Sequence, residues 1–163
     1  MPRMKKTLLS AMIVFASVGT AGAGGQPGSI GVGAEFEISQ IGGLSANYDA
    51  GKFHVGGFLS FQDPAGVNNT RFELGGRFFF HVASTASSDF SVGGGLGFRN
   101  TGRGANNGST TELFIEPSFQ IRAFIASNVA LSFTGGFSIG ALDASDLVID
   151  GQVEGIAGVH YYF

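Results

Sequence analysis

The stretch that decides the fold is Gly158-Val159-His160-Tyr161-Tyr162-Phe163, at the end of the sequence. Apolar side chains stand at every second position, so a β-strand would place Val159, Tyr161 and Phe163 on one face. The ends of domains usually fray into polar residues. A strand that alternates up to a final aromatic residue therefore predicts an apolar surface against one face along its whole length.

The same alternation recurs in seven further segments. In each, apolar side chains take one face, and mostly polar side chains or glycines take the other. An even number of antiparallel strands joined by hairpins can close and leave no unpaired backbone group in a lipid bilayer. We therefore predict an all-β fold, an eight-stranded antiparallel up-and-down transmembrane barrel. Its strands are expected at residues 29–39, 44–48, 53–62, 71–82, 90–99, 112–122, 129–139 and 153–163.

The connections between these segments differ in length. Short turns are expected on the periplasmic side, at residues 49–52, 83–88 and 126–128. The other connections are expected to face outward, and residues 100–110 form the most polar of them. Pro117 falls within a predicted strand, where it removes a backbone donor, so we expect a bulge there.

Composition favours a membrane barrel over a soluble domain. The chain has 28 glycines and 17 phenylalanines, and only 13% of its residues are charged, against about a quarter in soluble domains. It contains no cysteine, so disulfides cannot stabilise it.

The first 23 residues have the pattern of a secretory signal peptide. A basic start precedes roughly a dozen mostly apolar residues, and Ala21-Gly22-Ala23 matches an A-x-A cleavage site. We predict a signal peptide at residues 1–23 and one barrel domain at residues 24–163. Three of the nine basic residues lie in the signal peptide, which leaves six against twelve acidic residues. This balance argues against nucleic acid as a partner.

Aromatic residues support a lipid-facing exterior. One set is expected to point outward at strand ends beside the short turns: Tyr48, Phe53, Phe80, Phe90, Tyr161 and Phe163. A second outward set is expected nearer the opposite rim: Phe36, Phe61, Phe72, Phe98 and Phe137. Two bands of rings are the aromatic girdles expected at the two interfaces of a membrane.

The chain resembles the small eight-stranded outer-membrane barrels: OmpX, OmpW-type proteins and the transmembrane domain of OmpA. The most specific element is Gly158, followed by Tyr161 and the terminal Phe163, which resembles the C-terminal insertion signal of this class. The class often has a polar residue two positions before the glycine, where this chain has Ile156.

The resemblance implies a location in the bacterial outer membrane. It implies that periplasmic chaperones deliver the chain and that the barrel-assembly machinery reads the insertion signal. The expected partners of the folded protein are outer-membrane lipids and lipopolysaccharide, and we expect a monomer.

The predicted interior contains charges and glycines. Four carboxylates are expected near Arg77, at Glu35, Glu73, Glu116 and Glu154. Since buried charges need partners, we interpret them as an ionic plug. A gated path for small solutes, lined by the same charges, is the alternative. The inward glycines Gly93, Gly95 and Gly97 are expected to make room for large side chains from other strands.

Three inward histidines, His54, His81 and His160, lie near the periplasmic end. They would form a metal site only if they converged, and the sequence favours ordinary polar packing and no cofactor. The acidic segment that contains Asp143, Asp146 and Asp150 is interpreted as a solvated loop rather than as a cation-binding site. No histidine has a serine two positions on, as outer-membrane deacylases would require, so we expect no catalytic activity.

These features favour a structural, envelope-integrity or surface-interaction role for a plugged barrel. The main alternative is a narrow pore, or a barrel that transports small solutes or lipids. A more remote one is a soluble lipocalin-like binding protein, which would need an apolar interior.

Deletion of Phe163 tests the insertion signal. We expect the deletion to reduce the amount of barrel in the outer membrane more than it lowers the stability of barrels already formed. Immunoblots of membrane fractions give the first quantity, and urea unfolding of refolded protein gives the second. Wild-type amounts of the deletion variant in the outer membrane would contradict the assignment.

Overall fold

The computed structural model describes residues 26–38, 42–64, 70–102, 108–142 and 152–163. Its strands, in chain order, are β1 (Ile30–Glu37), β2 (Gly42–Asp49), β3 (Phe53–Gln62), β4 (Arg71–Ser84), β5 (Ser88–Gly102), β6 (Ser109–Ala126), β7 (Val129–Leu142) and β8 (Gln152–Tyr162). Among the described residues, no helix is long and apolar enough to cross a membrane. The predicted signal peptide and the acidic loop at residues 143–150 lie outside the described residues.

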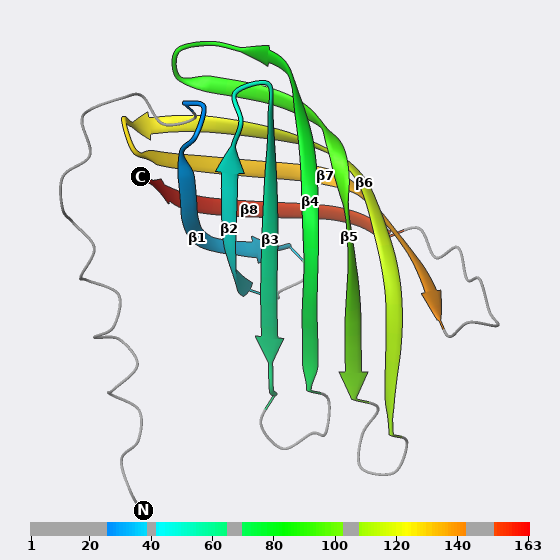
Figure 1. The fold of residues 1–163 in the computed structure, drawn as a ribbon. Helices are drawn as coiled ribbons and strands as arrows, with labels where there is room; N and C mark the ends of the chain where they lie inside the picture. The colour runs from blue at the N-terminus through cyan, green and yellow to red at the C-terminus, as the bar shows by residue number, and fades with distance from the viewer. Residues whose placement is uncertain (1–25, 39–41, 65–69, 103–107, 143–151) are drawn as a thin grey trace, which may run out of the picture.

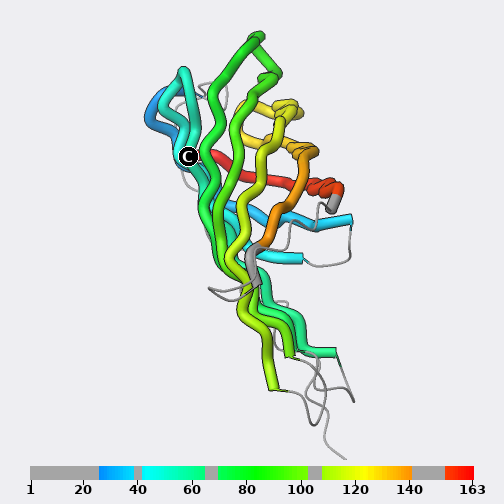
Figure 2. Tube along the Cα trace, turned by 90° about the vertical axis from the view of Figure 1, so that its right-hand side faces the viewer, coloured from blue at the N-terminus to red at the C-terminus, as the bar shows by residue number. Residues whose placement is uncertain are grey.

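The strands form a closed barrel in sequence order (Figures 1 and 2). Each strand pairs antiparallel with its sequence neighbours, and β1 pairs with β8 from Gly31 opposite Tyr162 to Glu37 opposite Ile156. The predicted fold class, an eight-stranded antiparallel barrel, is confirmed.

The two ends of the barrel differ in their connections. At one end, here called the short-turn end, residues 50–52, 85–87 and 127–128 connect the strands (Figure 1). Gly51 adopts a φ of 87°, and its N–H donates to Asp49 Oδ1 at 2.8 Å. The start of β1 and the end of β8 also meet here, since Phe163 N donates to Ile30 O at 2.9 Å. The opposite end, with the longer connections, is called the long-connection end.

Strands β5 and β6 extend beyond their predicted bounds. Residues 100–110 were expected to form a polar loop, but Asn100 pairs with Thr111 and Gly102 pairs with Ser109. The prediction is wrong at both ends of this segment because its polar side chains bond to each other across the pair. Asn100 Nδ2, for example, donates to Thr111 Oγ1 at 2.9 Å.

The irregularities of the sheet lie close to the short turns. Register shifts occur between His81 and Ala83 in β4 and between Phe124 and Ala126 in β6. Pro117 does not form the expected bulge, since the β6–β7 register is the same before and after it. The pairing is only interrupted there: Ile115 pairs with Ile139, and the next pair is Ser118 with Gly136. A missing N–H thus removes local pairing without adding a residue.

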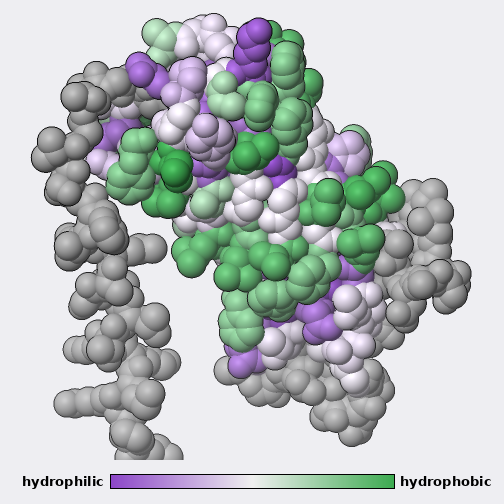
Figure 3. Space-filling view, viewed as in Figure 1, coloured by the Kyte–Doolittle hydropathy of each residue, from purple (hydrophilic) through white to green (hydrophobic). Residues whose placement is uncertain are grey.

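The strands expose apolar side chains outward and bury polar ones inward. Thirty large hydrophobic side chains are exposed among the described residues, against six buried hydrophobic residues. Hydrophobic residues accordingly cover much of the face shown in Figure 3. All six aromatic residues predicted beside the short turns are exposed: Tyr48, Phe53, Phe80, Phe90, Tyr161 and Phe163. Their role at a membrane interface stays a prediction.

Two of the three singled-out glycines make room for side chains, as predicted. A Cβ at Gly95 would lie 2.9 Å from Arg77 Cγ, and a Cβ at Gly97 would lie 2.7 Å from Phe114 Cζ. Gly93 is different, because its Cβ would lie 1.9 Å from the backbone oxygen of Phe78. The prediction for Gly93 is therefore wrong: the neighbouring backbone leaves no space there.

The substitution Gly93→Ala is expected to destabilise the barrel, by about 1–3 kcal/mol for overpacking. Gly76→Ala is the matched control on the adjacent strand, since its Cβ would lie 3.5 Å from the nearest atom, Gly56 O. Urea unfolding in detergent, followed by circular dichroism, should show a lower midpoint only for Gly93→Ala. Equal midpoints for the two variants would contradict this account.

Candidate functional site

The polar groups inside the barrel form the candidate functional site, and they gather at three levels. The central triad consists of Arg77, Glu35 and Glu116. The long-connection cluster consists of Arg71, Arg99, Glu73, Glu112 and Glu154. The short-turn cluster consists of Arg122, Asp49, Asp89, Tyr162, His54 and His81. All three sets follow from strand alternation, which turns every second side chain inward.

The central triad joins three strands that are not neighbours. Arg77 on β4 donates from Nη1 to Glu35 Oε2 at 2.5 Å and from Nε to Glu116 Oε2 at 3.1 Å. Its guanidinium also lies 4.0 Å from the centre of the Phe58 ring. Each of the three charged side chains is at most 11% exposed. The triad therefore ties β1, β4 and β6 across the interior.

The long-connection cluster takes the remaining predicted carboxylates. Glu73 accepts hydrogen bonds from Arg71 and Arg99. Glu112 Oε2 accepts from Arg99 Nη1 at 3.4 Å, and Glu154 Oε1 lies 3.8 Å from Arg99 Nη2. The predicted network is thus held by two cations rather than by Arg77 alone, and Glu154 also interacts with Glu116 of the central triad. Glu35 and Glu116 pair with Arg77, whereas Glu73 and Glu154 lie against Arg99.

The short-turn cluster centres on Arg122, whose side chain is 1% exposed. Its Nη2 donates to Asp49 Oδ2 at 2.7 Å and to Asp89 Oδ2 at 2.6 Å. Its Nη1 donates to Tyr162 OH at 3.0 Å. One guanidinium from β6 thereby holds side chains of β2, β5 and β8 together.

Sequence reasoning found the histidines of this cluster but missed its two aspartates. Asp49 was assigned to a turn, but it is the last residue of β2 and is fully buried. Asp89 was left between strands, but it lies directly opposite Arg122 in the β5–β6 pairing. The available signal was Arg122 itself: alternation along residues 112–122 places it on the same inward face as Glu116, and a buried guanidinium requires carboxylates nearby.

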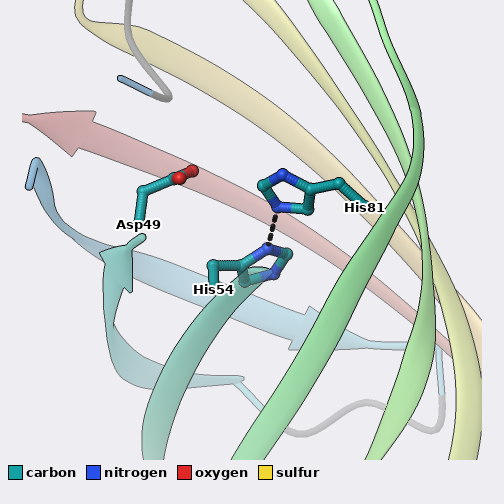
Figure 4. A group of neighbouring side chains, drawn as sticks. All are labelled: Asp49, His54 and His81. Atoms are coloured by element: carbon teal, nitrogen blue, oxygen red, sulfur yellow. Dashed lines mark hydrogen bonds between the residues drawn. The ribbon is translucent and has the colours of Figure 1, made fainter. Parts of the chain in front are cut away.

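Two of the three histidines come together, and the third does not join them. His54 Nδ1 lies 2.8 Å from His81 Nε2, and the Asp49 carboxylate completes a group whose ligand atoms lie within 4.8 Å of one another (Figure 4). His160 instead has its Nε2 2.6 Å from Ser45 Oγ. The three histidines therefore do not converge on one site.

A small cavity lies beside the central triad. It is lined by Glu116, Thr134, Glu154 and Ile156, among others, and has a volume of about 10 Å³. This is roughly the room that one water molecule needs.

Comparisons with solved structures identify the fold. The N-terminal β-barrel domain of Pseudomonas aeruginosa OprF superposes with a TM-score of 0.59 at 14% identity, covering 84% of this chain and 98% of that domain. Neisserial surface protein A superposes with a TM-score of 0.54 at 14% identity, covering 83% and 96%. The chain has the fold of a small outer-membrane barrel. No protein-family model matches the sequence, and no curated protein sequence matches it significantly.

The substitution Arg77→Ala tests the central triad. We expect it to lower the free energy of unfolding by about 3–5 kcal/mol, because it leaves Glu35 and Glu116 buried without their cation. Arg71→Ala is the control: Arg71 is 24% exposed, and Glu73 keeps Arg99 when it is lost, so a loss of at most about 1 kcal/mol is expected. Urea unfolding of both variants in detergent measures the difference. An equal loss of unfolding free energy in the two variants would contradict a stabilising role of the triad.

Proposed function

We propose that the protein is a monomeric integral protein of the bacterial outer membrane, closed inside by its own side chains, with a structural, envelope-integrity or surface-interaction role. One observation carries the proposal: apolar side chains cover the outside of a barrel whose inside is charged. A soluble protein rarely exposes such a continuous apolar surface, because water disfavours it. Lipid favours it, and the closed ladder satisfies the backbone there.

The arrangement of the two ends supports an orientation. Short turns face the periplasm in this class of barrel, and longer loops face outward. Exposed rings gather beside the short turns, where Tyr161 and Phe163 have ring centres 5.0 Å apart. We place these rings at the periplasmic interface, where aromatic residues are enriched. Membrane lipids and lipopolysaccharide are then the partners of the outer face.

The insertion signal remains part of this proposal. Tyr161 and Phe163 are exposed on the outer face, as recognition by the assembly machinery would require. Gly158 faces inward, and a Cβ there would lie 2.5 Å from Ser132 Oγ. Packing against Ser132 is therefore enough to explain a glycine at position 158. Tyr161 and Phe163 are the members of the predicted signal that packing inside the barrel does not explain.

A narrow pore is the second candidate function. The composition of the interior favours it, because eight inward carboxylates face four guanidinium groups among the described residues. The carboxylates are Glu35, Glu37, Asp49, Glu73, Asp89, Glu112, Glu116 and Glu154, and the cations are Arg71, Arg77, Arg99 and Arg122. Such a pore would prefer cations. The triad and the short-turn cluster both cross the interior, which favours the plug. The same charges argue against a lipocalin-like site for apolar ligands.

Recordings in planar bilayers distinguish plug from pore. We expect purified wild-type protein to give no reproducible unitary conductance, because the central triad blocks the interior. Arg77→Ala removes the bulkiest side chain of the triad and is the variant in which conductance would first be seen. Reproducible conductance of the wild type that disappears when Glu116 or Arg77 is altered would contradict the plugged barrel.

A further inference from the structure

The group formed by Asp49, His54 and His81 has a hydrogen-bonding pattern that fixes its protons. His81 Nδ1 lies 2.8 Å from Gly51 O, and a carbonyl oxygen only accepts, so Nδ1 carries the proton. In a neutral ring this leaves a lone pair on His81 Nε2, the atom that faces His54 Nδ1 at 2.8 Å. The two rings therefore share one proton between two nitrogen atoms.

The other nitrogen of His54 is left without a normal hydrogen bond. His54 is 1% exposed, and its Nε2 has no partner in hydrogen-bonding geometry among the described residues. The side chain of Gln120 interacts with His54. Its amide nitrogen donates to Thr134 Oγ1 at 2.9 Å, which leaves the amide oxygen as an acceptor. Moving the shared proton from His54 Nδ1 to Nε2 would let Gln120 accept it. That change frees the His54 Nδ1 lone pair, which then faces the lone pair of His81.

We propose that Asp49, His54 and His81 form a binding site for a divalent transition metal, with Zn²⁺ as the best-matched ion. Two imidazole nitrogens and one carboxylate are ligands that Zn²⁺ prefers, and three protein ligands leave a fourth position for water. The bond from His81 Nδ1 to Gly51 O is the outer contact that typically orients a metal-binding histidine. This site goes beyond the proposed function and does not depend on whether the barrel is plugged.

Metal binding requires the two imidazole rings to separate and to turn their lone pairs toward a common point. Zn–N bonds of about 2.0–2.1 Å in a tetrahedral arrangement separate two nitrogens by roughly 3.3 Å. The present separation of 2.8 Å must therefore open by about half an ångström. His81 is half-buried at the short-turn end, which gives an ion access from that side.

Arg122 is the resident competitor of the metal. Its Nη2 lies 2.7 Å from Asp49 Oδ2 and 3.1 Å from His81 Nε2, so it occupies part of the position that an ion would take. The guanidinium has two further partners, Asp89 and Tyr162, that can hold it when the ion enters. Asp49 can bind the metal through one oxygen while its Oδ1 keeps the bond from Gly51 N.

Zinc titration of the folded barrel without a histidine tag tests the proposal. Competition with a chromophoric chelator in detergent should show one Zn²⁺ bound per chain. His54→Ala and His81→Ala should each weaken binding by about tenfold or more. His160→Ala is the matched control, because His160 is equally buried and bonds to Ser45 instead, and it should bind Zn²⁺ as the wild type does. Circular dichroism verifies that each variant is folded.

If a variant does not fold, the thermal stability of the wild-type protein provides a second test of zinc binding. Zinc at one equivalent should then raise the unfolding temperature of the wild type, and a chelator should reverse the rise. No stoichiometric binding by the folded wild type would overturn the proposal. Binding that survives in the His54→Ala, His81→Ala double variant, or that is lost equally in His160→Ala, would overturn it as well.

Discussion

Seven residues of β1, from Gly31 to Glu37, pair in unbroken register with β8, from Tyr162 back to Ile156. This pairing closes the ladder, so that each of the eight described strands is paired on both sides. In lipid, an unpaired backbone group costs several kcal/mol, so closure is the condition for every other feature. It also forces alternation, since each strand then has one face toward the interior and one toward the surroundings. Exposed rings such as Phe36 and inward-facing ions such as Glu35 are adjacent in sequence for this reason.

Closure places charges in a narrow interior, where they must satisfy one another. Two guanidinium groups reach strands that do not neighbour their own: Arg77 ties β4 to β1 and β6. Arg122 ties β6 to β2 and β8, and also to its neighbour β5. These contacts are side-chain counterparts of the backbone ladder, acting across the barrel rather than around it. Breaking one partner of such a buried pair is far more costly than losing a pair at the surface. The interior is therefore a structural element, and the same density of ligands makes a metal site possible near Asp49.

Alternation made the outward and inward faces predictable, because period 2 is set by the strand itself. The exposed positions of Tyr48 and Phe90, and the inward positions of Arg77 and Glu116, follow from it. Contacts across the barrel were not predictable, since strand tilt and register decide which inward side chains meet. Register places Arg99 directly opposite Glu73 on the neighbouring strand, so Glu73 pairs with Arg99 rather than Arg77. The contact of Asp49 with Arg122 runs across the barrel from β2 to β6, and the assignment of Asp49 to a turn did not predict it. Backbone proximity at Gly93 and the uninterrupted register around Pro117 likewise depend on neighbouring strands.

The central claim is that this chain forms a closed barrel in the outer membrane. A gel that compares boiled and unboiled samples of outer membranes tests it most directly, because a closed ladder in detergent resists unfolding at room temperature and keeps a compact shape. We predict that the unboiled protein migrates at a different position from the boiled protein and that the difference disappears on boiling. A band at one position under both conditions, or recovery of the protein in the soluble periplasmic fraction, would contradict the account.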